Sequence, residues 1–243
     1  MRIVGVIPSR LGSTRLARKP LAEIAGKAMI ERVHEGARAF SGWSELLVAT
    51  DSDEILAFCR SKGIPAELTS PEHVSGTDRI REISSRRDGE LYVNVQGDEP
   101  MVTGAHIEAL VAPFAAVRGV AVSTLAVPFP ASEAGDPGTV KVVSRLDGRA
   151  LYFSRSPIPF DRDGAGARRW KHLGFYAYRR EALERFSTLP PSPLERAEKL
   201  EQLRFLENGI DIHVAAAPAD TFSVDTAEDL ARVEKYFQNL SKK

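Results

Sequence analysis

Residues 3–27, with the sequence IVGVIPSRLGSTRLARKPLAEIAGK, decide the fold of this chain. Ile3 to Ile7 form a short apolar run rich in β-branched residues, which predicts a buried strand. We expect Pro8 to end this strand, because proline has no N–H to donate to a strand ladder. The loop that follows contains Gly12, the hydroxyls of Ser13 and Thr14, and the cations Arg10, Arg15, Arg18 and Lys19. Positive charge and backbone amides are therefore predicted at the carboxyl end of the first strand.

In open α/β sheets, ligands bind at the carboxyl ends of the strands. Amides, hydroxyls, Arg and Lys together suit an anion such as phosphate. The loop has neither the Gly-x-Gly-x-x-Gly pattern nor the Gly-Lys-Ser/Thr pattern of known phosphate loops. A solvated basic loop is the alternative interpretation of the charge. Two features favour a phosphate site: the loop directly follows a buried strand, and Glu23 is the single acid in residues 3–27.

Composition narrows the class of protein. The 243 residues fit one large domain, and Lys plus Arg equal Asp plus Glu at 33 each. Zero formal charge argues against a general binder of nucleic acid or of membrane surfaces. The single cysteine, Cys59, allows no intrachain disulfide and indicates a reducing compartment. With no apolar run of about 20 residues and an N-terminal strand instead of a signal peptide, we expect a cytoplasmic protein.

Strands and helices alternate along the first half of the chain. Strands are predicted at 46–50, 64–68 and 91–95, and helices at 29–40, 54–62, 75–87 and 103–117. Such alternation predicts an α/β fold, Rossmann-like, with a mostly parallel mixed sheet and helices on both faces.

The pattern changes after Val120. An extended segment at 120–127 is followed by a hairpin of 140–143 and 149–153 around the turn Leu146-Asp147-Gly148. Later elements are predicted at 173–178 and 212–216 as strands, and at 180–187, 195–207 and 227–240 as helices. We interpret 120–175 as an elaboration within a single domain, 1–243. Because added apolar hairpins often cover a partner subunit, a homodimer is predicted.

Two carboxylates are candidate metal ligands. Asp98 follows the predicted strand 91–95 in the run Val-Asn-Val-Gln-Gly-Asp-Glu-Pro, where Gly97 lets a ligand approach the backbone. Asp225 lies just before the last helix, and capping of that helix is the alternative role for it. Mg²⁺ takes one or two protein carboxylates and bridges to phosphate oxygens. The two acids and the basic loop therefore suit one phosphate-handling site.

Two further groups of residues carry weaker signals. The run His73-Val-Ser-Gly-Thr-Asp-Arg79 begins a helix, where hydroxyls and free amides can bind an anion or the edge of a base. His172 and Tyr176 are four apart on a predicted strand, and Glu198 and Gln202 are four apart on a predicted helix. Each pair is therefore expected to share a face. From the residues alone, these side chains and Arg155 remain ordinary surface groups.

The sequence resembles the 3-deoxy-manno-octulosonate cytidylyltransferase (CMP-KDO synthetase) family almost from end to end. The runs 94–101 (NVQGDEPM) and 150–155 (ALYFSR) distinguish this family from other sugar cytidylyltransferases. Other matching stretches are 7–20, 48–51, 73–79, 124–128, 140–143, 172–174, 202–204 and 224–226. One departure is Ala17, where the family usually has proline.

The resemblance implies a nucleotidyltransferase fold and transfer of CMP from CTP to KDO, with Mg²⁺ required and pyrophosphate released, for lipopolysaccharide biosynthesis. It implies roles for individual residues. The triphosphate would be held by Arg10, Ser13, Arg15 and Lys19, of which Arg10 and Lys19 act in catalysis. The cytidine pocket would be lined by Pro8, Ser75, Gly76, Thr77 and Arg79. Mg²⁺ would bind the catalytic acids Asp98 and Asp225. The sugar acid would bind Gln96, Arg155, His172, Tyr176, Glu198 and Gln202.

Three alternatives stay open at this point. The same reaction on 8-amino-KDO or a sialic acid differs only at the sugar end. A module that senses CTP without catalysis would not need both acids. A glycosyltransferase would not need cations for a third phosphate.

Overall fold

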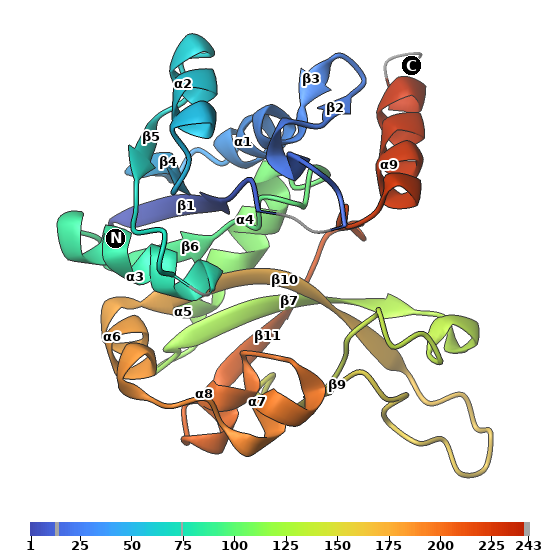
Figure 1. The fold of residues 1–243 in the computed structure, drawn as a ribbon. Coiled ribbons are helices and arrows are strands. Elements are labelled where there is room, and N and C mark those ends of the chain that lie inside the picture. The colour runs from blue at the N-terminus through green and yellow to red at the C-terminus, as the bar shows by residue number, and fades with distance from the viewer. Residues whose placement is uncertain (13–14, 74, 241–243) are drawn as a thin grey trace. The chain divides into compact units, whose positions relative to one another are not determined.

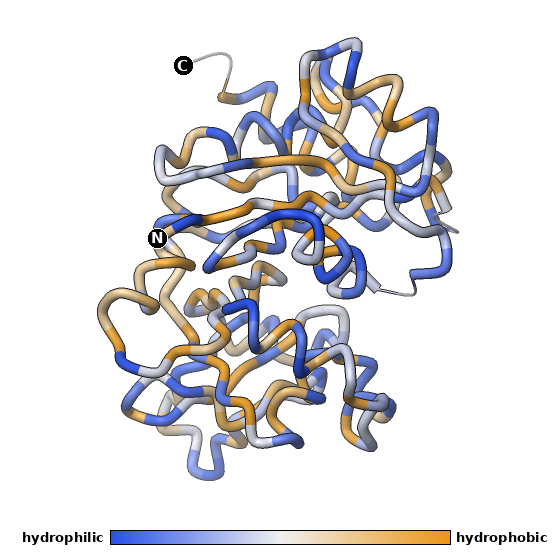
Figure 2. Tube along the Cα trace, turned by 90° about the vertical axis from the view of Figure 1, so that its left-hand side faces the viewer, coloured by the Kyte–Doolittle hydropathy of each residue, from blue (hydrophilic) through white to orange (hydrophobic). Residues whose placement is uncertain are grey.

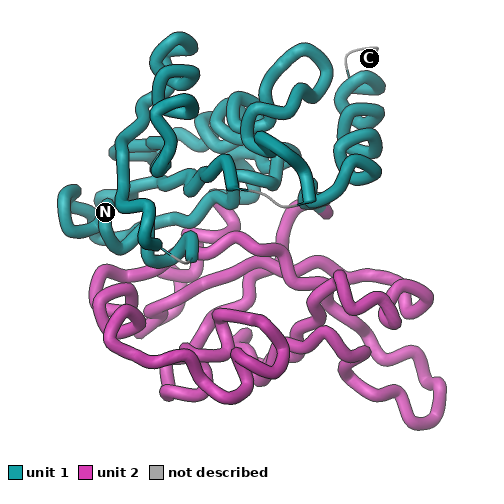
Figure 3. Tube along the Cα trace, in the orientation of Figure 1, with its two compact units in different colours: residues 1–107, 221–243 teal, residues 108–220 magenta. Residues whose placement is uncertain are grey.

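The computed structural model describes residues 1–12, 15–73 and 75–240. The chain gathers into two compact units, shown in teal and magenta in Figure 3. The first comprises residues 1–107 and 221–243, and the second comprises residues 108–220. The second unit thus includes the segment 120–175 and extends beyond it on both sides.

A parallel sheet forms the centre of the first unit. Its strands lie in the order β6 (Leu91–Asn94), β1 (Ile3–Ser9), β4 (Glu45–Thr50) and β5 (Ala66–Leu68). All neighbouring pairs among these four strands are parallel, as Figure 1 shows for their directions. Strands β1, β4 and β6 are largely buried, with Val6, Ile7 and Val48 fully inaccessible to solvent, whereas the edge strand β5 is partly exposed. In Figure 2 the hydrophobic colour follows the strands, while hydrophilic and hydrophobic colours alternate along the helices.

The predicted end of the first strand at Pro8 is wrong. Strand β1 continues to Ser9, and Pro8 pairs with Ala49 of β4. The pairing of β1 with β6 ends earlier, at Val6 opposite Asn94. Among the described residues of this unit, the strand beyond Val6 pairs with β4 alone, and proline is tolerated where one side of a strand needs no amide donor.

Helices α1 (Met29–Arg38), α2 (Asp53–Ser61) and α3 (Gly76–Arg86) connect the strands of the first unit. Ser52 caps α2 and Ser75 caps α3, each accepting a backbone N–H three residues on. The short helix η1 (Lys19–Leu21) follows the basic loop, and a small hairpin joins β2 (Glu23–Ile24) to β3 (Lys27–Ala28). The last helix, α9 (Ala227–Leu240), belongs to the same unit.

The single helix predicted at 103–117 is divided in two. The structure has α4 (Gly104–Val111) and α5 (Pro113–Ala116), with Pro113 as the first residue of the second helix. Proline favours a helix start and disrupts a helix interior, because it lacks the N–H and clashes with the preceding turn.

The second unit has mostly antiparallel strands. Strand β7 (Val122–Phe129) pairs parallel with β11 (Ile212–Ala216) and antiparallel with β10 (Arg169–Arg179). The predicted hairpin is formed by β8 (Lys141–Ser144) and β9 (Ala150–Ser154), and β8 also pairs with β10. Besides α5, the helices of this unit are η2 (Ala131–Glu133), α6 (Arg180–Thr188), α7 (Pro193–Glu198) and α8 (Leu203–Glu207). The strand directions confirm an α/β fold with mixed pairing.

The prediction that Glu198 and Gln202 share one helix face is wrong. Lys199 adopts the left-handed conformation, with φ of 55°, and ends α7 directly after Glu198. Gln202 precedes the next helix, α8, as its N-cap residue. Local backbone geometry at one lysine therefore replaces the predicted helix 195–207 with two short helices.

Candidate nucleotide site

A polar cavity of about 370 Å³ lies in the first unit. It is lined by Pro8, Ser9, Arg10, Gly12, Arg15, Lys19, Pro20, His73, Ser75, Gly76, Arg79, Gln96, Gly97, Asp98 and Asp225. These residues come from the end of β1, the basic loop, the start of α3, the turn after β6 and the segment before α9. Four cations and two carboxylates among them give the lining a net positive charge, which suits a polyanionic ligand.

Lys19 joins the two predicted metal ligands. Its Nζ donates to Asp98 Oδ2 and to Asp225 Oδ1, each at 2.8 Å. Burial opposes the charge on Lys19, but the neighbouring carboxylates outweigh it and raise the pKa of the ammonium. Because both oxygens lie 2.8 Å from one nitrogen, they are at most twice that distance apart. Two acids far apart in the chain therefore meet at one point.

Asp98 is positioned by the turn that follows β6. An added Cβ at Gly97 would lie 2.6 Å from the carbonyl oxygen of Pro8 and 3.0 Å from Ser9 Oγ. Only glycine permits this close approach of the turn to the end of β1. The carbonyl of Asp98 also accepts the N–H of Val224 at 2.9 Å, which aligns this turn with the segment that carries Asp225.

Asp225 does not cap the last helix. Thr226 Oγ1 accepts the N–H of Asp229 at 3.2 Å, and Asp229 Oδ2 accepts the N–H groups of Thr226 and Asp225. This reciprocal arrangement satisfies the start of α9 without the carboxylate of Asp225. That carboxylate instead accepts from Lys19 and, at 3.0 Å, from Arg15 Nη2. Capping therefore does not explain Asp225.

The donor set around Lys19 fits a hard divalent cation. Within residues 1–12, 15–73 and 75–240, no three His, Cys, Asp or Glu side chains gather as a complete metal cage. Mg²⁺ needs no such cage, because it binds through one or two carboxylates together with water and substrate phosphates. Asp98 and Asp225 supply two carboxylates beside a cavity suited to phosphate.

The start of α3 forms another wall of the cavity. Ser75 Oγ accepts the N–H of Asp78 at 3.2 Å and lies beside Gly76 in the lining. Arg79 is buried, and it donates to Asp51 Oδ2 at 2.8 Å and to Thr69 Oγ1 at 2.6 Å. Thr77, which the resemblance assigns to the cytidine pocket, is buried and is not in the lining. Ser13 lies outside the described residues.

Several lining residues were absent from the predicted site. His73 Nε2 lies 2.5 Å from Glu82 Oε2, so the carboxylate fixes the imidazole at the cavity. Ser9 Oγ is buried and has no hydrogen-bond partner among the described residues. An unpaired buried hydroxyl in a cavity wall favours a ligand or water that completes its bonding. The run 73–79 was a sequence signal for His73, but no sequence pattern indicated Ser9, which is the last residue of β1.

Arg155 and Glu198 meet in the second unit. Glu198 accepts Ser154 Oγ at 2.6 Å and the N–H of Arg155 at 2.9 Å. Arg155 Nε donates to the backbone carbonyl oxygen of Glu198 at 2.8 Å. Burial would raise the pKa of Glu198, but these hydrogen bonds and the guanidinium outweigh it and lower the pKa. Glu198 is therefore a fixed, ionised acceptor.

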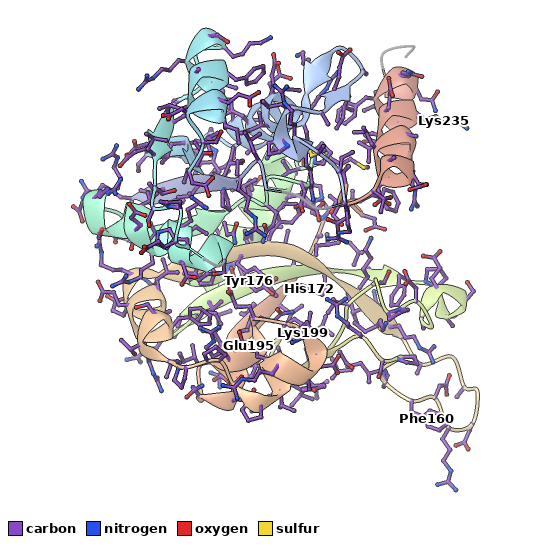
Figure 4. All side chains as sticks on the ribbon, viewed as in Figure 1. Phe160, His172, Tyr176, Glu195, Lys199 and Lys235 are labelled. Atoms are coloured by element: carbon purple, nitrogen blue, oxygen red, sulfur yellow. The ribbon has the colours of Figure 1, made fainter. Side chains whose placement is uncertain are left out.

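His172 and Tyr176 also lie together, with ring centroids 5.4 Å apart; Figure 4 labels both. A bulge between Leu173 and Tyr176 places them opposite Ala126 and Thr124 of β7, two residues apart, so they keep a common face. Thr124 Oγ1 donates to the carbonyl of Phe175 at 2.7 Å, so it accepts from His172 Nε2 at 2.9 Å. Burial lowers the pKa of His172 to about 3, which keeps the imidazole neutral.

The other two predicted sugar-binding residues, Gln96 and Gln202, belong to different units. Gln96 lines the cavity of the first unit. Gln202 is buried in the second unit, at the N-cap of α8.

Comparison with known proteins decides the family. The cytidylyltransferase family model matches residues 4–212. A 3-deoxy-manno-octulosonate cytidylyltransferase from Acidobacterium capsulatum is 56% identical over 97% of this chain and 96% of its own length. The chain belongs to the CMP-KDO synthetase family. A second relative with the same name, from Koribacter versatilis, is 48% identical over 98% of this chain and 91% of its own length.

A solved structure of another CMP-KDO synthetase agrees with this fold. That protein, described as a CMP:2-keto-3-deoxy-manno-octonic acid synthetase complexed with CTP, is 42% identical and superposes with a TM-score of 0.95. The match covers 98% of this chain and 99% of the other. The predicted nucleotidyltransferase fold is therefore confirmed for this member of the CMP-KDO synthetase family.

The single cysteine of the chain lies in helix α2 of the first unit. Cys59 is buried, and burial raises its pKa to about 11, so the thiol is a core group in this CMP-KDO synthetase family member. Among the described residues, none of the helices combines the length and apolar character needed to cross a bilayer.

Proposed function

We propose that this protein transfers CMP from CTP to the anomeric hydroxyl of KDO, giving CMP-KDO and pyrophosphate. The observation that carries the proposal is the meeting of Lys19 with Asp98 and Asp225 in a cationic cavity. Relatives that are 3-deoxy-manno-octulosonate cytidylyltransferases, at 56% and 48% identity, also support it. The reaction would activate KDO for lipopolysaccharide biosynthesis.

The nucleotide is assigned to the cavity of the first unit. Arg10, Arg15 and Lys19 would hold the triphosphate with Ser13, since Arg and Lys form charge-assisted bonds to phosphate. Cytidine is assigned to a second group of residues: Pro8, Ser75, Gly76, Thr77 and Arg79. The bonds from Arg79 to Asp51 and Thr69 support this assignment, because they hold its guanidinium in one place at the wall.

Mg²⁺ is the proposed cofactor, held by Asp98 and Asp225. When bound, it would offset negative charge on the phosphate and orient it for displacement. The ammonium of Lys19 now neutralises the two carboxylates. With nucleotide bound, we expect Lys19 to leave the acids and donate to the phosphates.

The sugar acid is assigned to Gln96 and to the second-unit residues Arg155, His172, Tyr176, Glu198 and Gln202. An Arg suits the carboxylate of KDO, because a guanidinium binds carboxylates through paired hydrogen bonds. Neutral His172 donates through Nε2 to Thr124 and leaves Nδ1 as an acceptor for a sugar hydroxyl. The hydroxyl of Tyr176 is buried without a hydrogen-bond partner among the described residues, which also favours a polar ligand there.

The reaction is an in-line displacement at the α-phosphate. The anomeric oxygen of the sugar forms the new bond to phosphorus, the bond to the β-phosphate oxygen breaks, and the hydroxyl proton leaves to solvent. Such a reaction asks the protein mainly for positioning and charge neutralisation. Lys19 and Arg10 would balance charge on departing pyrophosphate. No side chain is assigned as general base.

Two wider proposals accompany the reaction. We place it in the cytoplasm, which the lack of any possible intrachain disulfide supports. We also propose a homodimer, supported by large apolar side chains exposed on the second unit: Leu151 is 54% exposed and Phe160 is 86% exposed.

Pyrophosphate release tests the proposal. The purified protein is assayed with Mg²⁺, CTP and one sugar acid at a time: KDO, 8-amino-KDO or a sialic acid. We expect release with CTP and KDO, and at least tenfold lower kcat/KM when UTP replaces CTP. Preference for 8-amino-KDO or a sialic acid would keep the reaction class and change the substrate. CTP binding without release in any combination would contradict the proposal.

A further inference from the structure

Lys141 is a fully buried lysine at the start of β8 in the second unit. Its Nζ donates to the backbone carbonyl oxygens of Asp136 at 2.9 Å and Thr139 at 2.7 Å, and to that of Arg155. These three acceptors match the three protons of an ammonium group. A buried charge is tolerated only where such partners replace its hydration.

The three carbonyls belong to two segments that Lys141 draws together. Asp136 and Thr139 lie in the loop before β8, and Arg155 directly follows β9. The guanidinium of Arg155 clamps the same loop, because its Nη1 donates to the carbonyl of Pro137 at 2.9 Å. Lys141 therefore ties the loop 136–139 to the main chain of Arg155, and the side chain of Arg155 holds the same loop.

Residues next to Lys141 contact two other proposed sugar-binding residues. Lys141 lies opposite Ser154 in the β8–β9 register, and the Ser154 hydroxyl donates to Glu198. The residue before it, Val140, accepts the N–H of His172 at 2.8 Å. Movement of Lys141 would therefore be transmitted to Arg155, Glu198 and His172 together.

Packing alone does not require this lysine. A methionine would fill a similar volume without any cost of removing charge from water. Burial lowers the pKa of Lys141, and Asp136, whose side chain is exposed, only partly opposes that shift. Arg155 and Lys141 are two cations near the carboxylate of Glu198, and the exposed carboxylate of Asp136 is also close to Lys141. The three carbonyl groups that the ammonium binds are therefore the structural reason for a lysine at this position.

We infer that Lys141 is a positioning residue for sugar-acid binding: it holds the main chain at Arg155 and the loop 136–139 so that the guanidinium is kept in place for the ligand carboxylate. The inference rests on the proposed function and adds a residue to it. Lys141 is buried and touches no substrate itself; it acts through Arg155.

Steady-state kinetics of Lys141→Met test the inference. We expect KM for KDO to rise at least tenfold while KM for CTP stays within twofold of wild type, because the cavity assigned to CTP contains no residue that Lys141 contacts. Lys235→Met, which removes an exposed lysine in α9, is the matched control and should leave both constants unchanged. Lys141→Gln, which keeps one amide donor, should fall between Lys141→Met and wild type.

A double-variant cycle separates positioning from general stability. If Lys141 acts through Arg155, adding Lys141→Met to Arg155→Ala should raise KM for KDO by less than threefold further. A folded Lys141→Met protein whose KM for KDO stays within twofold of wild type overturns the inference alone. If neither Lys141 variant folds, the lysine is needed for folding and the inference is also overturned. Wild-type protein without activity on CTP and KDO instead contradicts the proposed function, and the inference with it.

Discussion

At the scale of single residues, the central feature is a lysine held between two acids. Lys19 is 14% exposed, and its ammonium contacts both Asp98 and Asp225. Arg15 adds a second cation to Asp225. Two positive and two negative groups therefore balance one another without a ligand. A nucleotide with its cation can replace these contacts one for one, because phosphate takes the cations and the metal takes the carboxylates.

Removing one carboxylate tests this arrangement. We expect Asp98→Asn to lower the rate at limiting Mg²⁺ by at least ~100-fold, which corresponds to ~2.7 kcal/mol of barrier. The amide keeps the size of the side chain but loses the charge that favours the cation. The measurement is initial pyrophosphate release from CTP and KDO over a series of Mg²⁺ concentrations.

Asp163→Asn is the control for Asp98→Asn, because Asp163 is exposed in a loop of the second unit. It should match wild type at every Mg²⁺ concentration. An Asp98→Asn protein within threefold of wild type at limiting Mg²⁺ would remove Asp98 from the mechanism.

Residue types predicted much of the site, and packing supplied the rest. Arg15, Lys19 and Asp98 were identifiable because charged groups follow buried strands at the edge where ligands bind. Asp225 was ambiguous in sequence, since an acid before a helix is a normal cap; only the bonds of Thr226 and Asp229 exclude that role. Lys141 was not predicted, because a lysine within an apolar hairpin gives no sign of the carbonyl groups that surround it.

At the scale of elements, the site depends on how closely two strand ends approach. The turn after β6 passes so near Pro8 and Ser9 that any Cβ at Gly97 would collide with the backbone. Backbone atoms cannot move aside as a flexible side chain can. The geometry of Gln96 and Asp98 is therefore tied to this one glycine.

We expect Gly97→Ala to displace the turn and lower kcat/KM for CTP at least tenfold, because Asp98 would move away from Lys19. Gly135→Ala is the control, since an added Cβ there has nothing within 4 Å. Thermal unfolding measured alongside kinetics shows whether the variant is folded at the assay temperature. A folded Gly97→Ala protein with wild-type kcat/KM would contradict this account of the turn.

Element boundaries were predictable where side chains determine them and unpredictable where backbone conformation does. Ser52 and Ser75 marked the starts of α2 and α3 through their hydroxyl caps. Pro113 offered a signal for the break after α4 that the apolar pattern across 103–117 obscured. Lys199 offered none, because lysine favours helices and left-handed lysine is uncommon. The bulge in β10 was equally invisible in the strand pattern.

At the scale of the whole molecule, association into a dimer is the prediction to test. The chain has a mass of 26.6 kDa. Its second unit exposes Leu151 on β9 and Phe160, which Figure 4 labels, in the loop between β9 and β10. We expect light scattering after size exclusion to give twice the chain mass at micromolar concentration. Leu151→Arg should shift the protein toward the monomer, because a buried unpaired charge opposes association.

Leu240→Arg is the control for the dimer, because Leu240 is an exposed leucine at the end of α9 in the first unit. It should leave the measured mass unchanged. A wild-type protein that has the mass of one chain at tens of micromolar would contradict the dimer.

The central claim is that the anomeric oxygen of KDO replaces pyrophosphate on the α-phosphorus of CTP. Phosphorus NMR of a reaction containing CTP, Mg²⁺ and KDO labelled with ¹³C at the anomeric carbon tests it most directly. We predict that the three CTP resonances are replaced by pyrophosphate and by one phosphodiester signal split by coupling to the labelled carbon. Unchanged CTP, or its conversion to CMP or CDP with no signal coupled to that carbon, would contradict the claim.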